Sequence, residues 1–258
     1  MKRILILGAG RMGAWLVEEL CHDYDVAVFD IDAKKMKYFF NVTRLTRHEM
    51  IKDFNPEMVI NAVTLHKTIP VFEEILPLLD KNCILSDITS VKTGLKDFYA
   101  ETGFRFVSTH PMFGPTFSNI RDLRNENAII ITDSCPEGIE FFRTFYGSLN
   151  LNISEYSFEG HDKTTAYSLS IPFVSSMVFA AVMKKQDAPG STFKKHMLIA
   201  EGLLSEDDYL VSEILFNPNT LEQVEKINAK LSYLIHILKA HDFDEMVKFL
   251  NTLRENIK

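Results

Sequence analysis

The chain has 258 residues, of which 46% are hydrophobic and 24% charged, and its formal net charge is −7. This composition is typical of a globular protein that folds throughout, and the length suits two modest domains. Because lysines and arginines are scattered rather than clustered, the sequence excludes the basic footprint of a nucleic-acid-binding protein.

The N-terminal half alternates short apolar runs with segments of helical periodicity. Runs that are apolar on both faces are typical of strands in a buried parallel sheet, and they cover residues 3–7, 26–30, 58–63, 83–88, 104–109 and 128–132. Helical spacing is clear in Met12–His22 and Lys67–Leu79. This alternation predicts an α/β fold with a doubly wound, mostly parallel sheet of the Rossmann type.

A glycine-rich turn follows the first run. Gly8 allows a tight turn, Gly10 lets the backbone approach a pyrophosphate, and Gly13 lets the next helix pack against the strand. The helix N-terminus favours a phosphate group, so the turn predicts a dinucleotide site rather than a turn without a ligand. We assign four further residues to the cofactor site: Arg11, Met12, Ala62 and Val63.

Asp30 ends the second run, 17 residues after Gly13. An acidic residue near this position binds the ribose hydroxyls of NAD, so NAD is favoured. Two alternatives fit the same residues. Asp30 could instead cap the next helix, and Lys34 and Lys35 could accept the 2′-phosphate of NADP.

Two polar clusters follow the runs 83–88 and 104–109, where ligands bind in open α/β sheets. The first cluster is Asp87–Lys92, and the second is Thr109–Pro115 with His110 beside Pro111. Proline holds the residue before it in an extended conformation, and a histidine that faces the crevice can act as a general base near neutral pH. A structural histidine fits this pattern equally well.

After about Ile153 the strand-like runs disappear, and Leu221–Lys239 and His241–Asn256 show helical spacing. A smaller, all-helical domain is therefore expected, with a break between Asn152 and His161. We divide the chain into residues 1–155 and 156–258.

The stretch Ala166–Met183 contains no charged residue and reaches the length of a short membrane span. Four serines and Pro172 dilute it, so we favour a helix at the centre of the helical domain, interrupted near Pro172. One chain would cover such a helix poorly, which predicts a homodimer formed through the helical domain and no membrane.

The sequence favours a cytoplasmic protein with reduced thiols. The cysteines form no zinc-binding spacing, so no metal is expected; they are Cys21, Cys83 and Cys135. The apolar run at the N-terminus stops at Gly8 without a signal-peptide cleavage site.

Taken in order, the glycine turn, the DxxSxK segment at Asp87, the HPMFGP segment at His110 and the pair His161–Asp162 resemble the prephenate dehydrogenase family over essentially the whole chain. The resemblance implies NAD(P)-dependent oxidative decarboxylation of prephenate to 4-hydroxyphenylpyruvate, on the route to tyrosine. It implies that His110 takes the ring hydroxyl proton and that Ser90 orients His110 or the substrate. Lys92 would hold the preceding loop, and we count it with the cofactor site.

The sequence departs from the family pattern on the substrate side. Leu169–Phe173 stands where relatives carry two histidines, and no arginine occurs between Arg143 and Arg254 to clamp a substrate carboxylate. A dianionic substrate needs paired charges. The nearest substitutes are on one segment, from which we expect at least one to reach the substrate, across a dimer interface: Lys194, Lys195 and His196. The alternative for each is a solvated helix face.

His161 and Asp162 have two interpretations, as a cap of the long apolar helix or as part of the substrate shell. Three functions remain open. The first is the prephenate dehydrogenase that the resemblance implies. The second is a dehydrogenase of arogenate or a short 3-hydroxy acid, and the third is a nicotinamide-binding sensor without catalysis.

Overall fold

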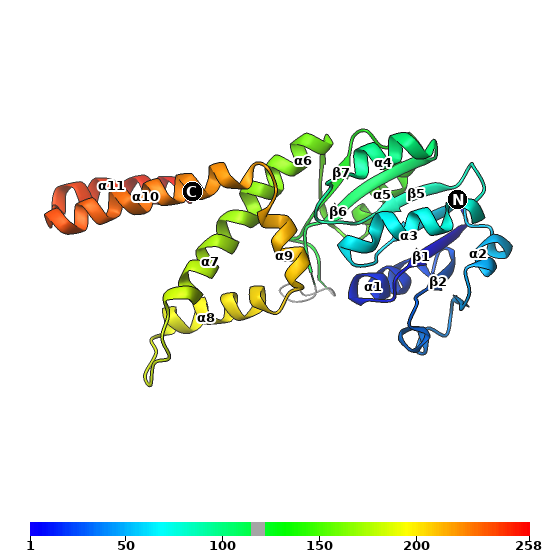
Figure 1. Cartoon of the computed structure of the whole chain (residues 1–258), viewed down its shortest axis with the longest axis horizontal. Helices are drawn as coiled ribbons and strands as arrows, with labels where there is room; N and C mark the ends of the chain where they lie inside the picture. The colour runs from blue at the N-terminus through cyan, green and yellow to red at the C-terminus, as the bar shows by residue number, and fades with distance from the viewer. Residues whose placement is uncertain (115–121) are drawn as a thin grey trace.

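The computed structural model describes residues 1–114 and 122–258, so Pro115 of the HPMFGP segment lies outside the described residues. A sheet flanked by helices forms the N-terminal part, and helices alone form the C-terminal part (Figure 1). The predicted fold class, a Rossmann-type sheet followed by a smaller helical domain, is confirmed.

The sheet has eight strands in the order β3-β2-β1-β4-β5-β6-β7-β8. The strands are β1 (Arg3–Leu7), β2 (Asp25–Phe29), β3 (Thr43–Leu45), β4 (Met58–Asn61), β5 (Ile84–Asp87), β6 (Arg105–Pro111), β7 (Asn127–Ile131) and β8 (Asn152–Tyr156). All neighbouring strands are parallel except β6 and β7, which are antiparallel. Strand order reverses between β1 and β4, which places a crevice at their carboxyl ends.

Two edge strands were not predicted. β3 has only three residues, and β8 carries Asn, Ser and Glu among its five, so neither forms the apolar run of a central strand. An edge strand can remain polar because only part of it is buried.

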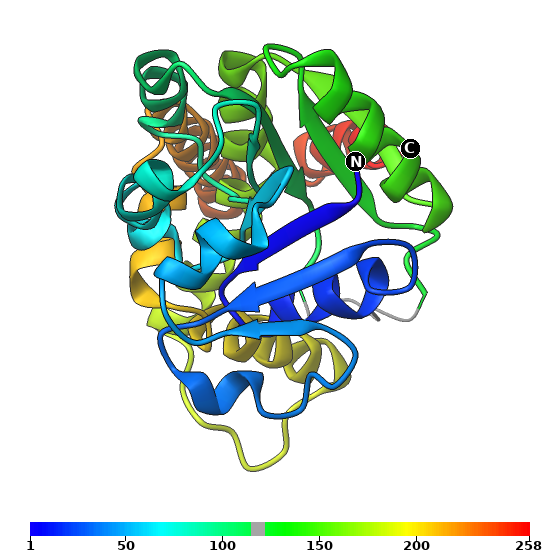
Figure 2. The ribbon, with the colours of Figure 1, turned by 90° about the vertical axis from the view of Figure 1, so that its right-hand side faces the viewer.

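The central strands send alternate side chains into two apolar layers. Ile4 and Ile6 of β1 pack in one layer, and Leu5 and Leu7 in the other. The first layer lies under α1 (Arg11–Leu20) and α5 (Pro136–Ser148). The second lies under α2 (Glu49–Phe54), α3 (Thr68–Ile75) and α4 (Leu95–Thr102), so helices cover both faces (Figure 2).

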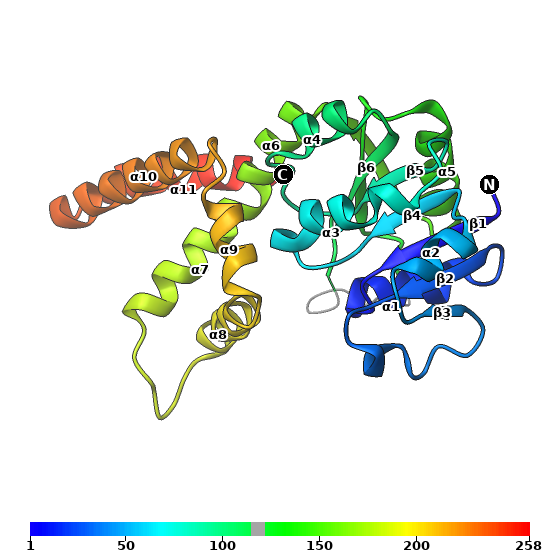
Figure 3. The ribbon, with the colours of Figure 1, turned by 45° about the vertical axis from the view of Figure 1, so that its right-hand side comes forward.

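The helical part contains α6 (Phe158–Thr165), α7 (Ile171–Val182), α8 (Ser191–Leu204), α9 (Asp208–Leu215), α10 (Thr220–Ala240) and α11 (Phe243–Asn256). The α10–α11 hairpin projects away from the sheet, and α9 lies on the side of the helical part that faces it (Figure 3).

α6 and α7 join into one helix through a π-helical segment, Ala166–Ser170. Pro172, in the first turn of α7, has no backbone N–H to donate, so the predicted interruption takes the form of a π turn rather than a break. Among the described residues, Phe158–Val182 is the helix that is long and apolar enough to cross a membrane, and only 17% of its most apolar stretch is buried. Most of that stretch is therefore exposed in the single chain.

Candidate active site

The glycine turn between β1 and α1 leaves room for a ligand. Gly8 has a φ of +92°, and a Cβ there would lie 2.9 Å from the backbone oxygen of Ala62. A Cβ on Gly13 would lie 1.9 Å from the backbone oxygen of Gly8, whereas one on Gly10 would meet nothing within 4 Å. No side chain caps the N-terminus of α1 and no acidic residue lies in its first turn. This open, positively polarised terminus fits a pyrophosphate.

Asp30 lies beside the same turn. Its Oδ2 accepts a hydrogen bond of 2.7 Å from the backbone N–H of Ala9, and its Oδ1 accepts one from Asp32. The next helical turn is capped by Asp32, which accepts from the backbone N–H of Lys34. The alternative that Asp30 caps this turn is therefore wrong. Lys35 Nζ lies 3.7 Å from Asp30 Oδ2, so a cation stands close to the predicted ribose site.

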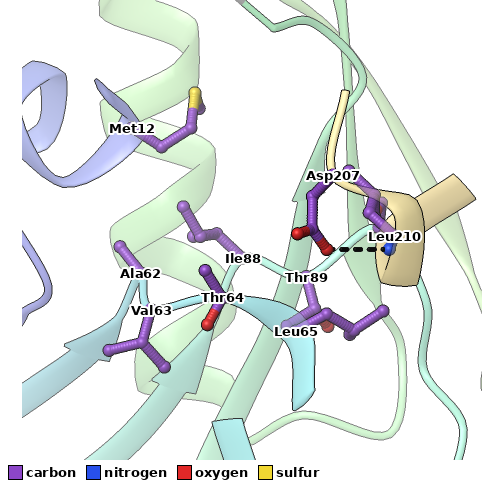
Figure 4. Close-up of a pocket in the computed structure, with 10 residues that line it drawn as sticks. Met12, Ala62, Val63, Thr64, Leu65, Ile88, Thr89, Asp207 and Leu210 are labelled. Carbon is purple, nitrogen blue, oxygen red and sulfur yellow. Dashed lines mark hydrogen bonds between the residues drawn. The ribbon is translucent and has the colours of Figure 1, made fainter. Parts of the chain in front are cut away.

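A cavity of about 690 Å³ lies at the carboxyl edge of the sheet, between the sheet and helices α7–α9. Seven of the predicted residues line it: Gly10, Arg11, Met12, Ala62, Val63, Ser90 and His110. Beside it is a smaller pocket of about 200 Å³, where Met12 and Ala62 lie across from Asp207 and Leu210 (Figure 4). Gly8, Gly13 and Asp30 do not line this cavity.

His110 lies near the end of β6 and is 5% exposed. Its Nδ1 is 3.0 Å from Nε2 of His161, and Nδ1 of His161 is 3.2 Å from a carboxylate oxygen of Asp162. Burial, then the neighbouring His161 and Lys92, hold the pKa of His110 well below its usual value. A neutral imidazole on the cavity wall can accept a proton.

Ser90 lines the same cavity, but no hydrogen bond among the described residues joins it to His110. Of the two roles that the resemblance implied, the direct orientation of His110 by Ser90 is not supported. Its contact with a bound substrate stays a prediction.

Lys92 supports the fold internally and does not contact the cofactor site to which we assigned it. Its side chain has no exposed surface, and Nζ lies 2.5 Å from Asp87 and donates to the backbone oxygen of Thr109 at 2.7 Å. Tyr99 donates to the other carboxylate oxygen of Asp87. Burial alone would raise the pKa of Asp87, but Lys92 outweighs it and the net pKa is lowered. The ion pair ties the β5–α4 loop to β6, as the loop-holding role requires.

The predicted substitutes for the missing arginine lie elsewhere. Lys194, Lys195 and His196 are exposed on α8, and none of them lines the cavity of this chain. His196 Nδ1 lies 3.0 Å from the backbone oxygen of Thr192. Contact of these three side chains with a substrate in the same chain is therefore not supported. Contact across a dimer interface stays a prediction.

His161 and Asp162 do not cap the apolar helix. Ser157 does, because its side chain accepts from the backbone N–H of Gly160, and His161 lies one turn later with no exposed surface. A serine placed directly before the first residue of the helix, Phe158, is the signal that could have revealed this cap.

The positions of the family's two histidines are filled without charge. Ser170 is buried and hydrogen-bonds Thr220 at 2.7 Å, and Phe173 lines the cavity. Sequence reasoning missed two acidic lining residues, Glu206 and Asp207. Asp207 caps α9, so a capping signal existed for it, but only the fold brings either residue to the cavity. Among residues 1–114 and 122–258, no group of three or more acidic, histidine or cysteine side chains is placed to hold a metal.

The chain is similar in sequence to proteins of known activity. Residues 18–143 match the profile of the prephenate dehydrogenase nucleotide-binding domain. A probable arogenate/prephenate dehydrogenase of Methanocaldococcus jannaschii is 23% identical over 95% of this chain, which spans only 58% of that protein. The chloroplastic arogenate dehydrogenase 2 of Arabidopsis thaliana is 24% identical over 88% of this chain and 67% of its own length.

Solved structures share the fold. Prephenate dehydrogenase from Aquifex aeolicus, in complex with hydroxyphenyl propionate and NAD+, superposes with a TM-score of 0.84 at 18% identity over 100% of this chain and 99% of that one. Arogenate dehydrogenase from Synechocystis gives a TM-score of 0.77 at 16% identity, with 98% of each chain covered. These findings support the resemblance that the motifs predicted: residues 18–143 match the nucleotide-binding domain of prephenate dehydrogenases, and the whole chain shares the fold of these solved structures.

Proposed function

We propose that this protein is an NAD-dependent dehydrogenase that converts prephenate to 4-hydroxyphenylpyruvate in tyrosine biosynthesis. The observation that carries the proposal is that His110 lines the same cavity as Gly10 and Arg11 of the phosphate-binding turn. A base is thereby held beside the place where a nicotinamide would reach. A protein that only sensed the cofactor would not need it.

The reaction needs one base and one hydride acceptor. His110 takes the proton of the ring hydroxyl as a hydride leaves the same carbon, so that a carbonyl forms there. Loss of carbon dioxide then sends a bonding electron pair into the ring, and the proton returns from His110 to the oxygen to give the phenol. Bound NAD supplies the hydride acceptor, which no side chain can provide.

NAD is proposed over NADP because the Asp30 carboxylate, held at the glycine turn, suits two ribose hydroxyls and repels a 2′-phosphate. Lys35, 3.7 Å away, weakens that repulsion. Michaelis constants for the two cofactors test this. Asp30→Ala should raise the constant for NAD more than that for NADP, and a native preference for NADP would contradict the assignment.

Arogenate is a second candidate substrate, because Glu206 and Asp207 line the cavity and a carboxylate stabilises the ammonium group that arogenate carries and prephenate lacks. The test is the ratio of kcat/KM for the two substrates. Glu206→Gln should lower the kcat/KM for arogenate relative to that for prephenate if these groups select arogenate. Asp207→Asn should do the same, and it keeps an N-cap for α9.

The deciding assay for the activity follows reduced nicotinamide by absorbance with each pairing of prephenate or arogenate with NAD or NADP. Turnover with at least one pairing is expected. The absence of turnover in all four would favour the sensor and overturn the proposal.

We also propose that the protein is a homodimer joined through its helical part. Large apolar side chains there are exposed in the single chain, including Leu198, Leu204, Leu231, Leu238 and Phe243. A second copy would cover them and could bring Lys194, Lys195 or His196 to the neighbouring cavity. Alanine variants of these three residues should raise the substrate Michaelis constant if any of them binds a substrate carboxylate.

A further inference from the structure

We propose that His161 and Asp162 form a hydrogen-bonded relay that fixes the tautomer of His110, leaving the Nε2 lone pair of His110 to face the cavity. His161 is thus a positioning residue that acts through His110. The catalytic consequence rests on the proposed function, but the tautomer itself does not.

Which groups can donate and which can only accept determines where each proton of the relay lies. A carboxylate only accepts hydrogen bonds, so the contact of 3.2 Å between Asp162 and His161 requires the proton on Nδ1 of His161. Neutral His161 then carries a lone pair on Nε2. The contact of 3.0 Å to His110 therefore requires that Nδ1 of His110 donate, and its own Nε2 is left without a proton.

Burial makes this arrangement specific. His161 has no exposed surface and His110 is 5% exposed, so water cannot readily replace either partner. Burial lowers the pKa of His161 more than the hydrogen bond that His161 donates to Asp162 raises it, so the ring stays neutral at pH 7. No described hydrogen bond uses Nε2 of His110, and His110 lines the cavity.

The tertiary structure holds the relay from three sides. α6 begins at the Ser157 cap and carries His161 and Asp162 at successive positions. Asn217, before α10, donates to the backbone oxygen of Asp162 at 2.9 Å, and the hydroxyl of Thr165 lies 3.4 Å from Nε2 of His161. Such support is what an imidazole needs if its orientation is to serve catalysis.

The relay also supplies charge where it is required. Once His110 gains a proton, Nδ1 still donates to His161, and Asp162 stabilises the new positive charge through His161. The negative charge of Asp162 thereby counteracts the repulsion between protonated His110 and the nearby ammonium of Lys92. Asp87, 2.5 Å from that ammonium, already neutralises it. A histidine that merely filled space would need none of these polar partners.

The first test reads the tautomer directly, without substrate. Protein labelled with 15N at histidine is examined at pH 7.5 by 15N–1H correlation of the ring atoms, and the signals that vanish in His110→Asn are assigned to His110. Nδ1 of His110 should be protonated and Nε2 unprotonated. In His161→Leu the proton should move to Nε2. An Nε2–H tautomer in the unmodified protein would overturn the proposal.

The second test is kinetic. His161→Leu should lower kcat about a hundredfold while the Michaelis constants for cofactor and substrate change less than about twofold. His161→Gln should recover at least about tenfold of that loss, because its amide oxygen can accept from Nδ1 of His110. Glu159→Gln, on the exposed surface of the same helix, is the matched control and should leave kcat unchanged.

The outcomes separate this inference from the proposed function. Turnover by the native protein together with unchanged kcat in His161→Leu, or equal losses in the Leu and Gln variants, would reject the relay. Lack of turnover with every pairing of substrate and cofactor would reject the function, yet the expected tautomer would still support the relay. If His161→Leu does not fold, the native tautomer and the Gln variant still decide.

Discussion

His110 and His161 are buried side by side where the end of β6 meets α6. A histidine in a sequence can have several roles, from a structural side chain in the core to a general base. Burial keeps the ring of His110 neutral, the cavity gives it access to a ligand, and its contact with His161 orients it. Each of these conditions comes from the surroundings.

Replacing His110 with asparagine tests its role as the base. Asparagine keeps a polar side chain of similar size but cannot take a proton, so kcat should fall by at least about a hundredfold. Cofactor affinity should remain, because the glycine turn is untouched. Rates and cofactor dissociation constants measure this, with His22→Asn, exposed after α1, as control. Near-normal turnover would remove His110 from the mechanism.

Acid should destabilise the fold through the same pair. Burial lowers the pKa of both His110 and His161, so the unfolded chain binds more protons than the native one below about pH 6.5. The stability conferred by neutral imidazoles is therefore complete above that pH and is lost as the pH falls toward the lowered values.

Urea unfolding at pH 7.5 and 5.5 measures this effect. The free energy of unfolding should drop between the two pH values, and the drop should be smaller in His161→Gln, which has one buried imidazole fewer. An equal drop in both proteins would show that other groups cause the acid sensitivity.

At the scale of elements, the junction of β1 and α1 assigns different tasks to two glycines. Gly13 is needed by the protein itself, because a side chain there would collide with the backbone of Gly8 at 1.9 Å. Gly10 faces open space, so a side chain there would collide only with a bound ligand. The sequence motif alone does not separate these tasks.

Alanine substitutions distinguish the two tasks. Gly13→Ala should lower the free energy of unfolding by about 2 kcal/mol or more, as overpacking does. Gly10→Ala should change it by less than about 1 kcal/mol and should weaken NAD binding at least about tenfold because the Cβ would approach the pyrophosphate. Urea unfolding and cofactor titration measure the two effects, and equal loss of stability in both variants would contradict this division.

At the scale of the whole molecule, the helical part is too thin to cover its own apolar surface. The long helix Phe158–Val182 is largely uncovered, and the α10–α11 hairpin extends away from the sheet (Figures 1 and 3). Burial of such a surface in a second copy would provide the stabilisation that one chain lacks.

Sedimentation at micromolar concentration should therefore give twice the mass of the chain. Leu238→Glu, at an exposed apolar position on α10, should shift the protein toward monomer, whereas Lys52→Glu on the distant α2 should not. A monomer in the unmodified protein would contradict the dimer.

Much of the fold could be read from local patterns. The six central strands are apolar on both faces because helices cover both sides of the sheet, and that leaves a clear signal in the sequence. β3 and β8 leave none, since partly exposed edge strands keep polar residues. The internal support by Lys92 could not be read, because a lysine beside a turn gives no sign that a buried aspartate and a strand carbonyl will enclose it.

By itself, then, the sequence determined the Rossmann order of the elements, the glycine turn, the acidic residue after β2 and the resemblance to prephenate dehydrogenases. These features follow from short-range spacing and backbone geometry. Only the tertiary structure decided that His161, 51 residues away, contacts His110, and that two carboxylates rather than Lys194 or Lys195 line the cavity of this chain. Such pairings depend on how a helix packs against the edge of the sheet, which no local pattern encodes.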